Sequence, residues 1–146
     1  MEQKRAIGFE IRTLNNLIKR YVKSVRPAEL DSSTGVHGWA LRFFYENKDK
    51  DIFQRDFETR FSIRRSTATN MLKLMETNGL IMRVSVDYDA RLKKIVLTDK
   101  AVDIHKKIAK NIDATEKLLS RNIDDKELEA FFSTLDKIKA NLEVEQ

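Results

Sequence analysis

The chain begins with a stretch whose apolar residues recur every three or four positions, which is the spacing of one helix face. These residues are Ile7, Ile11, Leu14, Ile18, Tyr21 and Val25. The pattern predicts one long helix that ends before Pro27, because proline cannot continue a helix. A polar turn over residues 31–35 then favours a second helix at about Val36–Asn47.

The next segment predicts two helices joined by a tight turn. A short helix over Gln54–Arg60 presents Phe57 inward, and Ser62 is expected to be the N-cap of a following helix at about Ile63–Thr77. Gly79 stands where a helix end favours a left-handed residue. The apolar side of the second helix consists of Ala68, Met71, Leu72 and Met75.

Two short strands follow, as alternating apolar and polar residues indicate. They run over Leu80–Val86 and about Leu92–Leu97, and a charged tip between them contains Asp89 and Arg91. A helix, a tight turn, a second helix and a hairpin are together typical of a winged helix-turn-helix. The predicted fold is therefore mainly α, with a two-stranded β-wing.

Two more amphipathic helices complete the chain, and Thr98 and Asp124 are their expected N-caps. Their apolar stripes, like that of the first helix, exceed what the small central module can cover. We predict a homodimer in which residues 1–32 and 99–146 form the helical dimerisation region around a DNA-binding domain at residues 33–98. The alternative is an intramolecular three-helix bundle.

Composition fits this picture and narrows the chemistry. Of the 146 residues 35% are charged, and the chain contains four Gly, one Pro and no Cys. This composition is typical of a helix-rich soluble protein, and it excludes disulfides and thiolate metal sites. The sequence shows neither a secretory leader nor an apolar run of membrane-spanning length, so we expect a cytoplasmic protein.

Positive charge is concentrated in the predicted module. Residues 61–100 carry eight basic and four acidic side chains, whereas residues 101–146 carry eight basic and ten acidic ones. Attraction to DNA phosphates requires such a concentration. A solvated basic surface is the alternative interpretation of the charge alone.

The candidate DNA-binding residues lie on the polar side of the second helix and on the wing. They are Arg64, Arg65, Ser66, Thr67, Thr69, Asn70, Lys73, Arg91 and Lys93. Asn can recognise adenine and Arg guanine through paired hydrogen bonds, although the helix residues alone would equally suit a solvated face. Lys93 and Lys94 alternate in direction, so we expect one of them to face phosphate, and we expect Asp89 to orient Arg91.

The same segments resemble the MarR family of winged-helix transcriptional regulators. The resemblance rests on the helix start S-I-R-R-S-T-A-T, the exit L-M-E-T-N-G-L-I-M-R and the wing D-Y-D-A-R-L-K-K-I-V-L-T. Its most specific part is Asp89-x-Arg91, and it departs from the usual family pattern at Asn70 and at the tip around Tyr88. These departures prevent the transfer of a known operator sequence.

The resemblance implies a homodimer on a palindromic operator, with recognition helices in successive major grooves and Arg91 at a minor groove. It also implies a repressor that releases DNA when a small anionic or aromatic ligand binds between the dimer helices and the winged module. For such a ligand the candidate residues are Tyr21, Trp39, Arg42 and Phe43. Core packing is the default interpretation of Trp39 and Phe43.

Other functions find less support in the sequence. Asp87 and Asp89 could chelate a metal, but they lack further ligands nearby, and His37 and His105 lie in different predicted helices. We therefore predict neither a metal nor a cofactor. The sequence shows no Gly-rich phosphate loop, no Cys nucleophile and no H-E-x-x-H motif, so we predict no enzyme. The alternative to a DNA-binding regulator is a winged helix used only for protein–protein contact.

Overall fold

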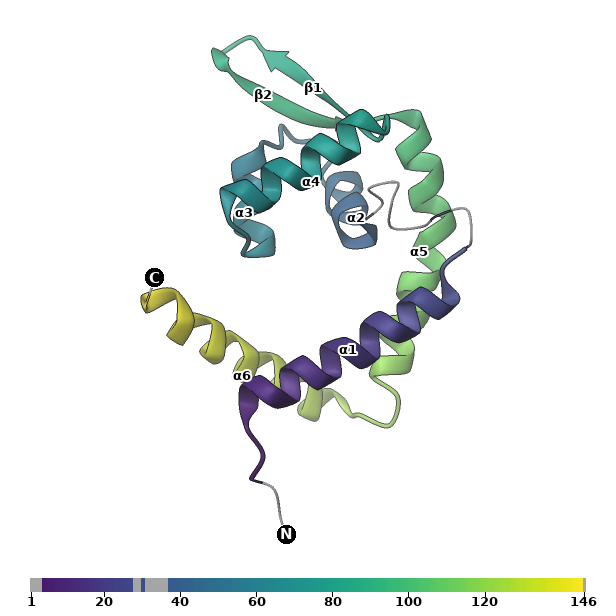
Figure 1. The fold of residues 1–146 in the computed structure, drawn as a ribbon, viewed down its shortest axis with the longest axis vertical. Helices are drawn as coiled ribbons and strands as arrows, with labels where there is room; N and C mark the ends of the chain where they lie inside the picture. Colours follow the sequence, from purple (N-terminus) through teal and green to yellow (C-terminus); the bar gives the residue numbers. More distant parts are fainter. Residues whose placement is uncertain (1–3, 28–29, 31–36, 146) are drawn as a thin grey trace. The chain divides into compact units, whose positions relative to one another are not determined.

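The secondary structure follows the predicted order along the chain. The protein is described by a computed structural model, which covers residues 4–27, 30 and 37–145. These described residues form six helices and one two-stranded antiparallel sheet, shown in Figure 1. The elements are α1 Ile7–Val25, α2 Gly38–Glu46, α3 Gln54–Phe61, α4 Arg65–Thr77, β1 Ile81–Val86, β2 Asp89–Leu97, α5 Asp99–Leu119 and α6 Asp125–Val144.

The chain divides into two compact units, residues 1–112 and residues 113–146. Helix α5 begins in the first unit and ends in the second. The predicted polar turn at residues 31–35 and the predicted start of the second helix at Val36 lie outside the described residues. Within the described residues, no helix has both the length and the apolar character that crossing a membrane requires.

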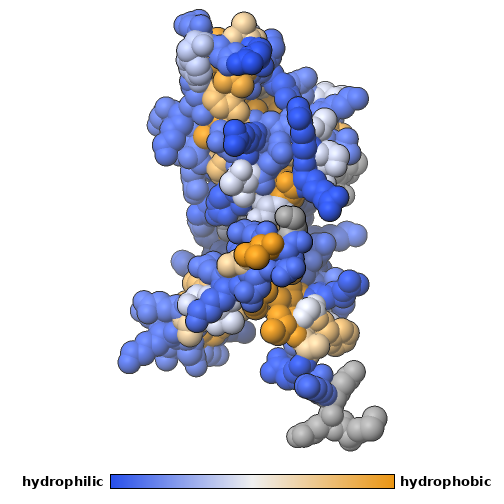
Figure 2. Space-filling model, turned by 90° about the vertical axis from the view of Figure 1, so that its left-hand side faces the viewer, coloured by the Kyte–Doolittle hydropathy of each residue, from blue (hydrophilic) through white to orange (hydrophobic). Residues whose placement is uncertain are grey.

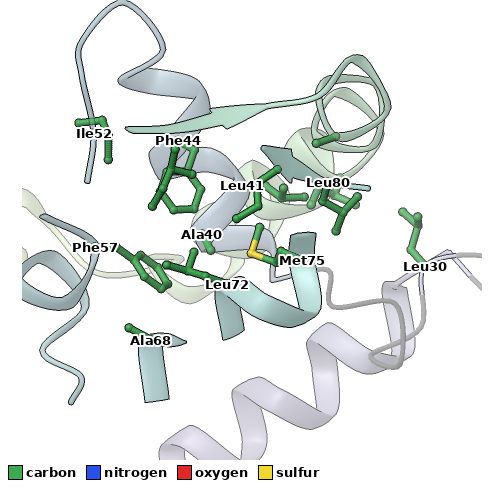
Figure 3. Close-up of a cluster of buried hydrophobic side chains, with 14 residues drawn as sticks. Leu30, Ala40, Leu41, Phe44, Ile52, Phe57, Ala68, Leu72, Met75 and Leu80 are labelled. Carbon is green, nitrogen blue, oxygen red and sulfur yellow. The ribbon is translucent and has the colours of Figure 1, made fainter. Parts of the chain in front are cut away.

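The hydrophobic core of the first unit lies between helices α2, α3 and α4, the first part of α5 and the base of the hairpin. Figure 3 shows Leu41 and Phe44 of α2 beside Leu72 and Met75 of α4. Phe57 of α3 is fully buried, as the sequence predicts. Full burial of one such side chain contributes about 1.5–3 kcal/mol to folding, so this cluster gives the module its rigidity.

Aromatic rings join the first two helices of this core. The Phe57 ring centroid lies 5.3 Å from that of Phe44 and 4.8 Å from that of Phe61. Phe43 completes the group, with its centroid 5.8 Å from Phe61 in an edge-to-face arrangement. Such tilted and edge-on geometries are the favoured ones for aromatic pairs.

The turn between α3 and α4 differs from the sequence prediction. Ser62 is not the N-cap of α4; it closes α3 in the left-handed conformation, with φ 51° and ψ 45°. Its backbone N–H donates to the Thr59 carbonyl at 3.3 Å. Helix α4 therefore starts at Arg65, with Arg64 at the N-cap position. The tight turn requires one residue with positive φ, and Ser62 adopts this conformation instead of capping the next helix.

The wing is attached to the module at its base. Ile81 pairs with Leu97 in the antiparallel register, and Ile81 and Ile95 belong to the core. The Ile95 N–H also donates to the Ile52 carbonyl at 2.7 Å, which ties the segment before α3 to β2. In Figure 1 the hairpin extends from this base toward the upper left of the view, above α4.

Thr98 and Asp124 cap the two C-terminal helices, as the sequence predicts. The Thr98 hydroxyl accepts from the Ala101 N–H at 3.2 Å and donates to the Gly79 carbonyl at 2.6 Å. Gly79 has φ +72°, the left-handed conformation expected of it at the end of α4. At α6, Asp124 and Glu127 each accept a hydrogen bond from the other's backbone N–H. This reciprocal pair is a capping box.

Helices α1 and α6 each leave apolar side chains exposed. None of the residues of either helix is buried. On α1, Ile7 is 64% exposed, and Figure 2 shows orange patches between blue side chains on the surface. On α6, Phe132 is 55% exposed. These faces lack the cover that the core gives to α2, α3 and α4.

Candidate nucleic-acid interface

Helix α4 presents one polar face to solvent and one apolar face to the core. Ala68, Leu72 and Met75 are fully buried, which fixes the rotation of the helix. The candidate side chains on the other face are all exposed: Arg65, Ser66, Thr67, Thr69, Asn70 and Lys73. Arg64, just before the helix, is exposed as well. The arrangement offers hydrogen-bond donors and positive charge on an element that fits a major groove.

Leu74 is an apolar residue on this exposed side that the sequence analysis passed over. It is 40% exposed and stands four positions after Asn70, so the two side chains share one helix face. An apolar side chain in a major groove can contact the methyl group of thymine. The four-residue spacing from Asn70 is the sequence signal that could have identified Leu74.

A hydrogen-bonded group fixes α4 relative to α3 and the wing. Gln54, the first residue of α3, donates from Nε2 to the Thr69 hydroxyl at 2.9 Å. Its Oε1 accepts from Arg83 of β1 at 3.4 Å, and Arg83 also pairs with Glu76 of α4 at 3.3 Å. Thr69 is thus engaged within the protein, while its hydroxyl hydrogen stays available to donate. Sequence reasoning missed Gln54 and Arg83 because these contacts join distant segments.

At the wing tip, Asp89 holds Arg91 in place. The Arg91 Nε and Nη2 atoms donate to the two carboxylate oxygens at 3.2 and 3.1 Å, and its backbone N–H donates to Oδ1 at 2.9 Å. The Arg91 side chain is nevertheless 89% exposed. Because a guanidinium has five N–H donors, the others face outward and can bind phosphate or a base edge. These hydrogen bonds also lower the pKa of Asp89 below its usual value.

The two adjacent lysines of β2 differ in their contacts. Lys94 pairs with Asp51 at 3.3 Å and is 35% exposed. Lys93 is exposed and lies 3.4 Å from the Ser85 hydroxyl. Lys94 is therefore engaged within the protein, and Lys93 is the better candidate for a phosphate contact.

The structure brings together only part of the predicted ligand-binding group. The Arg42 guanidinium lies 5.6 Å from the ring centroid of Trp39, and Arg42 also pairs with Glu46 at 2.9 Å. Phe43 packs in the aromatic cluster of the core, as its default interpretation predicts. For Trp39 the default interpretation of core packing is wrong. Its side chain is 53% exposed, because it lies on the side of α2 that faces away from the core. Tyr21 lies on α1 and is 39% exposed.

Metal-binding clusters are not found in the part of the chain that the structure describes. There, no group of three or more His, Asp or Glu side chains is arranged to hold an ion. Asp89 binds Arg91 instead.

Comparison with known proteins agrees with this geometry. The sequence model of the MarR family matches residues 34–92. An uncharacterised HTH-type transcriptional regulator, YybA of Bacillus subtilis, is 22% identical over 139 residues, covering 95% of this chain and 87% of YybA.

Solved structures share the fold over nearly the whole chain. The transcription regulator MarR of Oenococcus oeni is 25% identical with a TM-score of 0.77, covering 92% of this chain and 99% of that one. The MepR–DNA complex of S. aureus is 20% identical with a TM-score of 0.81, covering 94% and 96%. The sequence, the winged helix-turn-helix and these similarities lead to one conclusion: residues 34–92 match the MarR family model, and the chain shares its fold with the solved transcription regulator MarR of Oenococcus oeni.

Proposed function

We propose that the protein is a sequence-specific DNA-binding transcriptional regulator, with α4 as its recognition helix and Arg91 as its minor-groove contact. The observation that carries the proposal is the exposed polar face of α4 on a module that also presents Arg91, held by Asp89. The buried face of α4 fixes its rotation, so the same side chains always point outward. A preformed helix of this kind avoids the cost of ordering the backbone on binding.

The exposed apolar stripe of α1 supports a homodimer as the binding species. Ile11 and Leu14 are 44% and 45% exposed, and Leu17 is 58% exposed. A second copy that covers these residues would give the protein two-fold symmetry. In such a dimer the two recognition helices would meet half-sites about 34–36 Å apart on a palindromic operator.

Repression and its relief by a small effector are a further part of the proposal. Trp39 and Arg42 together offer an aromatic face and a cation, which suit an aromatic carboxylate. Trp39 is the one tryptophan of the chain, so the tryptophan fluorescence of the protein reports directly on the surroundings of Trp39 and Arg42. Titration with benzoate should change that fluorescence and weaken DNA binding. A ligand that changes neither signal would leave the effector part without support.

The central experiment measures binding to labelled duplex DNA by fluorescence anisotropy, first with duplexes selected from a random pool. Affinity should fall steeply as salt rises, because binding at phosphates releases counterions. Arg91→Ala should weaken binding by about 1–3 kcal/mol if the side chain contacts base edges.

A matched variant separates a specific contact from a loss of charge. Arg121→Ala, in the turn after α5, removes the same charge outside the winged module and should leave the affinity within a factor of about two, because it removes only long-range attraction. If the wild-type protein binds no duplex at low salt, the regulator proposal fails and the protein–protein module becomes the better interpretation.

A further inference from the structure

The outer part of the wing has little apolar support: Val86 alone among its apolar side chains is buried, and it lies outside the core cluster. The base of the wing is anchored by Ile81 and Ile95, but Met82, Val84 and Leu92 are 52%, 36% and 36% exposed. A two-stranded hairpin is at best marginally stable in water by itself. Something other than the core must therefore hold the tip, where the proposed DNA contact lies.

Asp51 provides a polar attachment at this place. The Tyr88 hydroxyl, at the turn of the hairpin, donates to Asp51 Oδ2 at 2.9 Å. Lys94 of β2 donates from Nζ to the other oxygen, Oδ1, at 3.3 Å. We call these three residues the wing clasp. One carboxylate of the loop between α2 and α3 thus holds the hairpin at two points that are six residues apart.

The carboxylate of the clasp is itself held by the backbone. Its neighbour Ile52 is buried and accepts the hydrogen bond from the Ile95 N–H at 2.7 Å. Hydrogen bonds from Tyr88 and Lys94 lower the pKa of Asp51, so the carboxylate stays charged near neutral pH. The clasp therefore connects the wing tip to the rigid part of the module.

We propose that Asp51 is a positioning residue for DNA binding, which acts through Tyr88 and Lys94 to hold the wing tip where Arg91 meets the duplex. The inference rests on the proposed function, since it assigns the clasp a role in the same interface. Tyr88 precedes Arg91 by three residues, and Asp89, which binds Arg91, is its direct neighbour. Movement of Tyr88 away from the loop would displace the guanidinium.

The sign of the charge makes the proposal testable. Asp51 is an acidic group on a module that is proposed to approach phosphates. Electrostatics alone therefore predict that its removal tightens DNA binding. The wing clasp predicts the opposite, because the wing loses its attachment. Asp49, two residues earlier in the same loop, is also exposed and offers the matched control.

The experiment compares DNA affinities of the full-length wild type, Asp51→Ala, Tyr88→Phe and Asp49→Ala by anisotropy at one salt concentration. Tyr88→Phe removes one hydroxyl and no charge. We expect Asp51→Ala and Tyr88→Phe to weaken binding about two- to tenfold, the net worth of one hydrogen bond. Asp49→Ala should bind as tightly as the wild type or more tightly.

Two further measurements separate positioning from general destabilisation. Hydrogen exchange should accelerate at the wing amides of Asp51→Ala and Tyr88→Phe but stay unchanged in α3 and α4. In an Arg91→Ala background, Asp51→Ala should cause no additional loss of affinity, since the clasp acts through Arg91.

The results separate a failure of the wing clasp from a failure of the proposed DNA-binding function. If the wild type binds DNA and Asp51→Ala binds equally well or better, the wing clasp has no positioning role. An additional loss in the Arg91→Ala background would also overturn the assigned route through Arg91. If the wild type binds no duplex at all, the proposed function fails and this inference fails with it.

Discussion

The winged module and helix α1 differ in how much apolar surface each buries within one chain. In the module, Phe57, Leu72 and Met75 are fully enclosed. In α1 no residue is buried, and Phe9 is 58% exposed. The module is therefore completed by its own chain, whereas α1 leaves its apolar side chains uncovered. The winged module, which is proposed to contact DNA, is thus packed within a single chain. Helix α1, which is proposed to set the spacing of two modules, would be covered only in a dimer.

The largest expected effect is a loss of stability, caused by a substitution that creates a cavity in the core of the winged module. Leu72→Ala should lower the free energy of unfolding by about 2–5 kcal/mol, because this residue of α4 is fully buried in the core. Chemical denaturation measures this change. The matched control is Leu74→Ala on the same helix, which is 40% exposed and should cost less than about 1 kcal/mol. Equal costs for the two variants would show that the core is not as well enclosed as the structure implies.

A charge introduced into the apolar stripe of α1 tests whether this stripe is a dimer surface. Leu14→Lys should raise the dissociation constant of the proposed dimer by at least about 30-fold, the equivalent of about 2 kcal/mol at one buried interface position. Sedimentation over a range of concentrations measures this change, and unfolding of the module should not respond.

The control for this variant is Asn16→Lys, which adds the same charge on the opposite side of α1. Both side chains are exposed in the single chain, so folding alone would tolerate both changes. If both variants sediment like the wild type, the stripe is not a dimer surface.

The smallest effect concerns the pH dependence of the wing. The pKa of Asp89 is lowered by its hydrogen bonds with the Arg91 side chain and backbone. A carboxyl group with a lowered folded-state pKa contributes stability above its unfolded pKa, about 3.9 for Asp, and loses it as the pH falls through the folded value. The wing tip should therefore loosen only below about pH 4, while α3 and α4 stay protected.

Hydrogen exchange of the Arg91 amide against pH measures this loosening. The variant Asp89→Asn should abolish the acid step, because its amide does not titrate. A step that persists in this variant would assign the pH dependence to another group, with Asp51 of the wing clasp as the next candidate.

Local patterns predicted those features that local physics controls. The burial of Ala68, Leu72 and Met75 followed from helical spacing, and the left-handed Gly79 followed from its place after a helix. The Asp124 cap followed from the residue type that favours this position. In each case the determining atoms lie within a few residues of one another.

Features that depend on distant segments could not be predicted in this way. The bond between Tyr88 and Asp51 joins positions 37 residues apart, and that between Gln54 and Arg83 joins positions 29 apart. Residue type favours core packing for Trp39, but the direction in which α2 packs decides its exposure. Ser62 suits an N-cap by composition, and the geometry of the tight turn gave it a different conformation.

The hydroxyl of Thr98 also marks where the protein can be re-engineered. By binding both the Gly79 carbonyl and the Ala101 N–H, it joins the exit of α4 to the entry of α5 through one oxygen atom. A hairpin from a similar protein could replace residues 80–97 with both of its ends near this oxygen, because the Thr98 hydroxyl also lies 3.3 Å from the Leu80 carbonyl. Keeping Thr98 in such an exchange would preserve the connection between α4 and α5 while the wing is replaced.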